Sequence, residues 1–168
     1  MTSDPHPTSA EVAYLGVDAL VDRFEAGTLT SAGLLDVLLA RIAVVDDPAG
    51  KVGLRSIAAL ADDARTVAAE RDLELARGDI RGPLHGVPVV IKDNIEVAGL
   101  PGAAGSTSLI GRPATDATLV TRLREAGAVV IGSTNLSEWA NIRSGRSTAV
   151  PADRRQGPAR HWRPASFH

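Results

Sequence analysis

Apolar and polar residues alternate along the first half of the chain with the spacing of helices. Apolar residues recur on one face between residues 11 and 26, and Gly27 follows as a signal for the C-terminal end of a helix. Residues 34 to 45 repeat Leu, Ile and Val with a period near 3.6, which predicts a second helix. A third helix is predicted over residues 59 to 77. We expect these helices to pack against other elements rather than to carry chemistry.

Two short β-branched runs in the second half predict buried strands. They cover residues 87 to 91 and 128 to 131, and a loop and a predicted helix from about residue 116 to 126 separate them. Two apolar strands joined through a helix favour parallel pairing with a right-handed crossover. The pattern therefore predicts an α/β protein in which both strands are covered on both faces.

The strand predicted over residues 87 to 91 ends directly before Lys92, within the sequence GPLHGVPVVIKDN. Ligands of parallel sheets bind beyond the C-terminal ends of the strands. The segment from Gly132 to Asn135 follows the next predicted strand at the same edge. Burial depresses the pKa of a lysine, and a neutral amine in a pocket is a general base. The alternative is a strand-end lysine that reaches water through its flexible stem.

Other polar residues near this edge have simpler predicted roles. Asn135 and Glu138 have the spacing of a capping box that starts a short helix around LSEWAN. His85 is best explained as part of the PLHG turn, since a lone histidine gives no support for a metal. The glycine-rich loop from Gly99 to Gly111 could cradle a phosphate, but it matches neither a dinucleotide fingerprint nor a P-loop. We predict no metal and no cofactor.

Two segments, GPLHGVPVVIKDNIEVAGLPGAAGSTSLIG and ATDATLVTRLREAGAVVIGSTNLSEWAN, closely resemble the first part of the amidase signature family. The resemblance is strong from Gly82 to about Thr148 and weaker from Leu29 to Gly78. It implies the N-terminal portion of a mostly parallel sheet flanked by helices, incomplete in this chain. It also implies a Ser, cis-Ser, Lys triad that cleaves carboxamides through an acyl-enzyme, in which Lys92 matches the triad lysine. The implied partner is a small-molecule amide substrate.

The two serines of that triad have no match in this chain. In the family they follow the region matched by Gly132 to Asn141, in a segment rich in glycine and serine that also supplies oxyanion donors. Residues 151 to 168 contain four arginines and three prolines but no Leu, Ile or Val. Ser166 is the only serine there, and it lacks the glycine neighbours that would let backbone amides converge on an oxyanion.

The extent of the resemblance and the change in composition after it divide the chain into three predicted parts. An N-terminal helical segment covers residues 1–28, a partial amidase-like domain covers 29–148, and a disordered Arg/Pro-rich tail covers 149–168. A shifted reading frame or a truncation would explain the tail. We expect the chain to be an inactive N-terminal fragment of an amidase.

Composition narrows the class of protein further. The net charge is -2, and acidic and basic residues are interspersed up to about residue 150. This distribution argues against a nucleic-acid partner. Disulfides and thiolate metal sites are excluded because there is no cysteine. The start, MTSDPHPTSAE, lacks the features of a signal peptide, and no apolar stretch reaches the ~18 residues of a membrane span. A cytoplasmic location is the default expectation, and the sequence does not indicate an oligomeric state.

Two other functions stay open, and a third is disfavoured. The missing serines favour a non-catalytic remnant or an interaction protein. A fragment of a tRNA-dependent amidotransferase subunit belongs to the same family. The sequence VVIK resembles a kinase strand, but no glycine-rich phosphate loop precedes it, so a kinase-like module is disfavoured.

Overall fold

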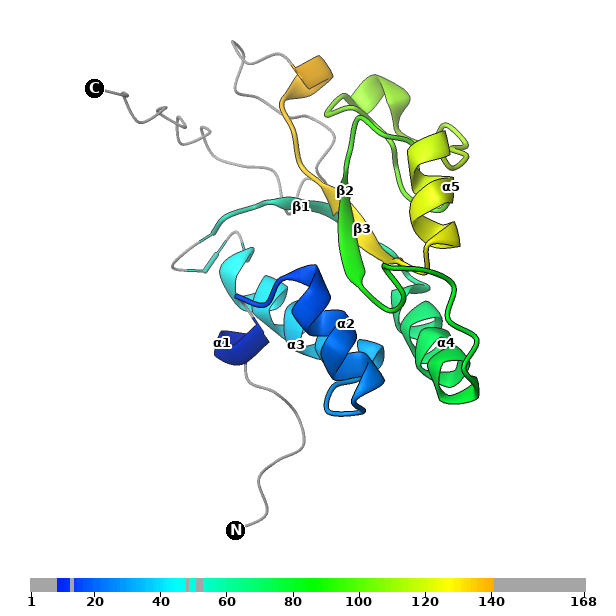
Figure 1. The fold of residues 1–168 in the computed structure, drawn as a ribbon. Helices are drawn as coiled ribbons and strands as arrows, with labels where there is room; N and C mark the ends of the chain where they lie inside the picture. The colour runs from blue at the N-terminus through cyan, green and yellow to red at the C-terminus, as the bar shows by residue number, and fades with distance from the viewer. Residues whose placement is uncertain (1–8, 13, 48, 51–52, 141–168) are drawn as a thin grey trace, which may run out of the picture.

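The computed structural model describes residues 9–12, 14–47, 49–50 and 53–140, which form a small mixed sheet with helices on both faces (Figure 1). The helices are α1 (Ser9–Val12), α2 (Val17–Glu25), α3 (Ser31–Val45), α4 (Ala64–Arg77) and α5 (Thr118–Glu125). The strands are β1 (Ile57–Leu60), β2 (Pro88–Lys92) and β3 (Val129–Thr134), and two short 3₁₀ turns are η1 (Thr107–Leu109) and η2 (Glu138–Ala140). The predicted tail, residues 149–168, lies outside the described residues, and the three predicted domain boundaries stay predictions.

The predicted helices are present, with corrected bounds. The helix expected over residues 11–26 is two helices, α1 and α2, because the extended backbone of Gly16 caps the start of α2. The helix expected over residues 34–45 begins earlier, at Ser31, where the Thr30 hydroxyl accepts the Gly33 N–H at 3.0 Å. The Asp72 carboxylate also accepts the N–H groups of Ser31 and Ala32, so α4 holds the start of α3.

The helix predicted over residues 59 to 77 was wrong at its beginning. Residues 57–60 form β1, and the helix α4 begins at Ala64. The sequence IAAL fits a helical pattern locally, but here it pairs antiparallel with β3, with Leu60 opposite Gly132. Tertiary pairing decides the conformation of such a short apolar run. A Cβ added to Gly132 would lie 2.4 Å from the carbonyl oxygen of Ala59, so the approach of β1 requires a glycine at that position.

The sheet has the strand order β1-β3-β2, with β3 in the centre. The predicted parallel pairing is confirmed, since β2 runs parallel to β3 from the Pro88/Val129 pair to the Lys92/Thr134 pair. The β1 and β3 pair is antiparallel, so parallel pairing accounts for one of the two pairs in the described sheet.

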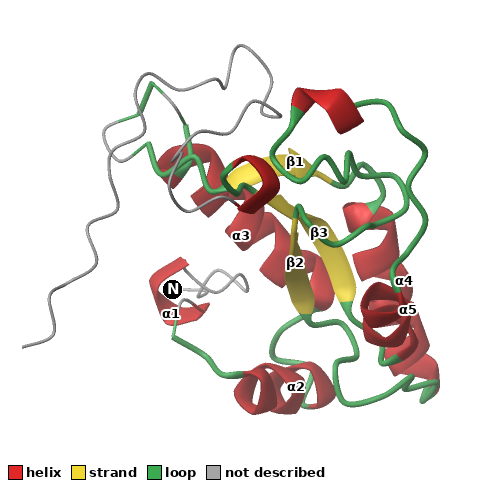
Figure 2. Ribbon diagram, turned by 90° about the horizontal axis from the view of Figure 1, so that it is seen from above, coloured by secondary structure: helices red, strands yellow, loops and turns green. Residues whose placement is uncertain are grey.

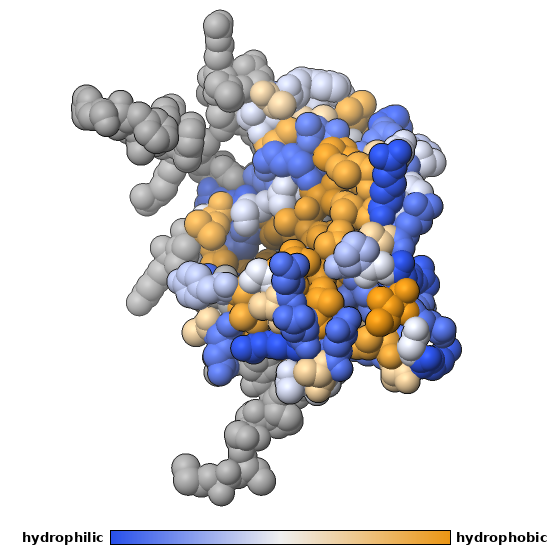
Figure 3. All heavy atoms as spheres, in the orientation of Figure 1, coloured by the Kyte–Doolittle hydropathy of each residue, from blue (hydrophilic) through white to orange (hydrophobic). Residues whose placement is uncertain are grey.

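Burial on both faces was predicted for both strands and holds for β3 alone. Residues 129–133 of β3 are all buried. The strand β2 lies at the edge of the described sheet, and Val90 is 43% exposed. Hydrophobic surface gathers at the centre of the face on which β2 runs (Figure 3).

Helices surround the three strands in the view from above (Figure 2). Alternate residues of β3 pack into two different hydrophobic clusters. Val129 and Ile131 lie in a cluster with residues of α3 and α4, whereas Val130 lies in a cluster with Val120 of α5. The same cluster holds Ile91 of β2, directly before Lys92. The cluster on the α5 side therefore holds the residue directly before the lysine.

Candidate functional site

Lys92 is the last residue of β2 and lies beside the end of β3. Its side chain is exposed, and Nζ donates a hydrogen bond to the backbone carbonyl of Asn135 at 2.7 Å. Lys92 is therefore not buried in the core, because its flexible stem brings the amine to the surface. Within the described residues, Nζ has no hydrogen bond to a serine hydroxyl.

Asp93 anchors the glycine-rich loop beside this lysine. Its buried carboxylate accepts the N–H groups of Ala103 at 3.2 Å and Gly105 at 3.1 Å, one on each oxygen. Its own N–H donates to the carbonyl of Thr134, which extends the pairing of β2 with β3 by one step. Sequence analysis missed this residue, although a carboxylate directly after an apolar strand was the available signal. The glycine-rich loop is thus held at the same sheet edge as Lys92.

The segment after β3 packs on the same loop. The hydroxyl of Ser106 donates to the Glu138 carboxylate at 2.7 Å, and the N–H of Trp139 donates to the Ala104 carbonyl at 2.8 Å. The predicted capping box was wrong, since the Asn135 amide donates instead to the carbonyl of Arg55. The helix expected around LSEWAN is the short turn η2, which contains a left-handed Trp139. Asn135 and Glu138 therefore bind residues distant in the sequence instead of capping a helix.

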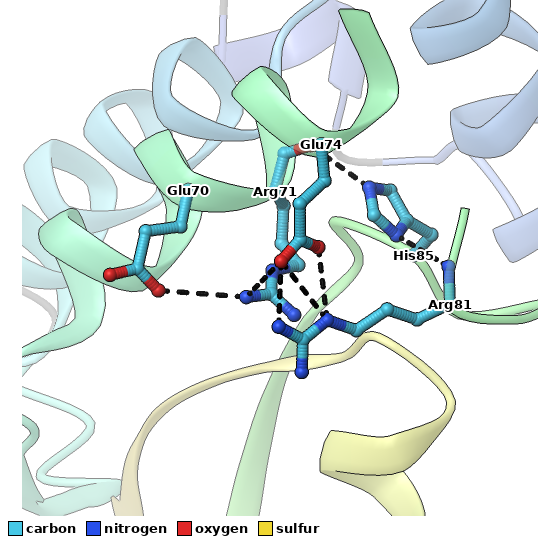
Figure 4. Close-up of polar contacts among 5 residues, drawn as sticks. All are labelled: Glu70, Arg71, Glu74, Arg81 and His85. Atoms are coloured by element: carbon cyan, nitrogen blue, oxygen red, sulfur yellow. Dashed lines mark hydrogen bonds and ion pairs between the residues drawn. The ribbon is translucent and has the colours of Figure 1, made fainter. Parts of the chain in front are cut away.

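A cluster of charged residues holds the turn that leads into β2 (Figure 4). The carboxylate of Glu74 lies between two guanidinium groups, 3.1 Å from Arg71 and 2.6 Å from Arg81. The hydrogen bonds from Arg81 hold the pKa of Glu74 below its usual range, and Glu74 in turn raises the pKa of Arg81. Burial lowers the pKa of Arg71, whose side chain is 5% exposed. The second carboxylate near Arg71 belongs to Glu70, at 3.5 Å.

His85 lies in the turn as predicted and has a structural role. Its Nδ1 accepts the N–H of Arg81 at 3.1 Å, and Nε2 lies 2.9 Å from the carbonyl of Arg71. Because a backbone N–H can only donate and a carbonyl can only accept, this geometry assigns the ring proton to Nε2. The ring therefore links α4 to the PLHG turn.

A small apolar hollow of about 220 Å³ lies next to this turn. Its lining residues come from α2, α4 and the turn, and they include Phe24, Leu75 and His85 but not Lys92. In the part of the chain that the structure describes, no group of three His, Asp or Glu side chains is arranged to hold a metal ion. None of the helices described is both long enough and apolar enough to cross a membrane.

Known proteins share the sequence pattern and the fold of this chain. The family model described as Amidase matches residues 35–161, which is most of the chain. The chain therefore belongs to the amidase family, and the resemblance given by its two long segments is confirmed.

Three similar proteins illustrate the match. The X-ray structure of native peptide amidase from Stenotrophomonas maltophilia is 46% identical with a TM-score of 0.77, and the match covers 88% of this chain and 30% of that chain. An amidase family protein from Bacillus anthracis str. Ames is 36% identical with a TM-score of 0.72, covering 79% of this chain and 26% of that one. A Glutamyl-tRNA(Gln) amidotransferase subunit from Anaeromyxobacter sp. (strain K) is 40% identical over 140 residues, which are 83% of this chain and 28% of the relative.

The chain spans between a fifth and a third of the length of the curated relatives that it matches. These similarities establish the family and the α/β fold. The activity and substrates of a whole protein of this family are matters for proposal.

Proposed function

We propose that this chain supplies the lysine-bearing part of a site that hydrolyses carboxamide C–N bonds. The observation that carries the proposal is the place of Lys92 at the C-terminal end of parallel strand β2, in a chain of the amidase family. Ligands of open α/β sheets bind beyond these strand ends. The exposed amine of Lys92 is accessible there to a small amide and to a serine from another part of the protein.

In this proposal Lys92 takes up the proton that a nucleophilic serine loses, through a second serine. The serine oxygen bonds to the amide carbonyl carbon, the C–N bond breaks with proton transfer to the leaving amine, and water then hydrolyses the acyl ester. Nζ now donates to a backbone carbonyl and has no serine partner among the described residues. We therefore propose that residues 9–140 alone do not hydrolyse amides and that the serines come from outside them.

Two other candidates each have one supporting observation. The 40% identity to a Glutamyl-tRNA(Gln) amidotransferase subunit supports a fragment of such a protein, in which Lys92 would have the same role. The carbonyl partner of Lys92 in place of a hydroxyl supports a non-catalytic remnant or interaction protein.

A chimera tests the main proposal. Residues 9–140 replace the matching segment of the Stenotrophomonas maltophilia peptide amidase, and ammonia release from a peptide amide is measured. We expect an active chimera whose kcat falls by about 10⁴-fold or more in Lys92→Ala, as removal of one member of a catalytic triad costs in subtilisin. Lys51→Ala is the matched control, because Lys51 is the only other lysine in the sequence.

The 168-residue chain is assayed in parallel and should release no ammonia. Activity of the chimera that survives Lys92→Ala would remove the lysine from the mechanism. Turnover by the 168-residue chain that is lost in Lys92→Ala would show that the chain contains its own nucleophile.

A further inference from the structure

A chain of hydrogen bonds joins the amine of Lys92 to the C-terminal end of α3. Nζ donates to the Asn135 carbonyl at 2.7 Å, and the Asn135 N–H donates to the Ser56 carbonyl at 2.7 Å. The Ser56 hydroxyl donates to the carboxylate of Asp46 at 2.6 Å. Asp46 is the C-cap residue of α3, so the hydrogen bonds connect the end of β2, the segment after β3 and the end of α3.

Asp46 is placed to fix the backbone at the start of β1. Its side chain is buried, and it accepts the N–H of Ser56, the hydroxyl of Ser56 and, at 3.1 Å, the N–H of Ile57. Hydrogen bonds to a carboxylate are stronger than those between neutral groups. The next step along the sheet is the Ile57/Thr134 pair, directly before Asn135.

The backbone at Arg55 adds a second contact to Asn135. Arg55 has a φ of 53°, in the left-handed region that non-glycine residues avoid, and its carbonyl accepts the Asn135 side-chain amide at 3.2 Å. Such a conformation persists only where the surroundings determine it, as the three hydrogen bonds to Asp46 do here. The side chain and the N–H of Asn135 are thus both held by the residues just before β1.

We infer that Asp46 and Asn135 are positioning residues for Lys92. Asn135 presents the carbonyl that binds the amine, and Asp46 acts on it through Ser56 without touching the lysine. The inference rests on the proposed function, because a base must be held within about 0.5 Å of its working position. It assigns a catalytic consequence to a carboxylate at the C-terminal end of α3.

The test measures how fast the Lys92 amine of the full 168-residue chain is acylated by an N-hydroxysuccinimide ester. Mass spectrometry quantifies the Lys92 peptide, and N-acetyl-lysine amide added to each sample gives the rate of a free amine. Asn135→Ala keeps the backbone carbonyl that binds Nζ but removes the side-chain hydrogen bond to the Arg55 carbonyl. We expect Asn135→Ala and Asp46→Asn to displace that Asn135 carbonyl and so to raise the Lys92 rate about threefold or more, the factor that loss of the Nζ hydrogen bond allows. Asp47→Asn is the matched control, since this exposed neighbour accepts from Ala49 and does not reach Ser56.

Circular dichroism verifies that each variant is folded. If Asp46→Asn does not fold, Ser56→Ala takes its place, because it removes the hydroxyl and no charge. Rates equal to the control in folded Asn135→Ala and Ser56→Ala would overturn the inference.

The active chimera gives the second readout. We expect kcat of Asp46→Asn to fall about tenfold per folded molecule with KM nearly unchanged, because misplacing a catalytic group slows the reaction without weakening binding. A purely structural role would lower the yield of folded enzyme and leave its kcat unchanged, which would also overturn the inference. Failure of the proposed function is distinct, since it shows as full activity of Lys92→Ala whatever the acylation rates are.

Discussion

The carboxylate of Asp93 accepts the backbone N–H of Gly105 at 3.1 Å, across a sequence separation of 12 residues. This contact folds the glycine-rich loop back on the end of β2, beside Lys92. The other oxygen of Asp93 accepts the N–H of Ala103, so one buried side chain closes the loop at two points. The surroundings of the candidate base therefore depend on a neighbouring residue whose carboxylate binds the loop and not the lysine amine.

Asp93→Asn should lower the free energy of unfolding by about 1–3 kcal/mol, because one of two buried backbone N–H groups then faces an amide N–H₂ instead of an acceptor. Chemical denaturation of the variant and the unaltered chain measures the difference. Asp79→Asn makes the same change at an exposed site and should leave stability almost unaltered. Equal stability of the two variants would show that the loop is not anchored by Asp93.

Gly105→Ala should destabilise the protein more than Gly99→Ala does. Both glycines have positive φ, +73° and +82°, so both substitutions cost about 1 kcal/mol for the backbone conformation. A Cβ at Gly105 would also lie 2.8 Å from the Leu136 carbonyl oxygen, whereas at Gly99 it meets nothing within 4 Å. The difference between their midpoints in thermal unfolding isolates the packing of the loop against the segment after β3. Identical midpoints would contradict that packing.

The ion pairs of Glu74 should make stability depend on pH. The pKa of Glu74 is lowered in the folded protein, first by hydrogen bonding from Arg81, so its contribution is present above the unfolded pKa of about 4.3. That contribution is lost as the pH falls through the lower folded pKa. The difference in Tm between the unaltered chain and Glu74→Gln should therefore be largest near neutral pH and shrink in acid.

Glu70→Gln is the control for this titration. The Glu70 side chain is 56% exposed and lies 3.5 Å from Arg71, so its removal should cost much less. A Tm difference for Glu74→Gln that stays constant down to about pH 2 would exclude an ionised Glu74 as the source of the stability.

Lys92→Arg in the active chimera should lose as much activity as Lys92→Ala. A guanidinium keeps the positive charge and the hydrogen-bond donor but stays protonated, so it cannot accept the proton of a serine. Steady-state kinetics on a peptide amide measure the loss. An arginine variant with substantial activity would mean that Lys92 contributes charge rather than proton transfer.

The sequence by itself determined the elements whose patterns are long or whose ends are marked. The periodic apolar residues of α3, the glycine after α4 and the β-branched runs of β2 and β3 each carry a local signal, because side-chain spacing and backbone freedom act within a few residues. The placement of Lys92 at a strand end and the parallel pairing of its strand followed from the same patterns. The long segments around it were sufficient to identify the family.

Only the tertiary structure decided the rest, since the partners involved are distant in the sequence. The sequence IAAL became β1 because β3 offers it a pairing edge, and Asn135 left its capping pattern because the Arg55 carbonyl lies within reach. Val90 is 43% exposed and β2 lies at the edge of the described sheet, although the β-branched run predicted burial on both faces. The chain of hydrogen bonds from Lys92 to Asp46 likewise joins residues that are distant in the sequence. Its geometry exists only once the helices and strands have packed.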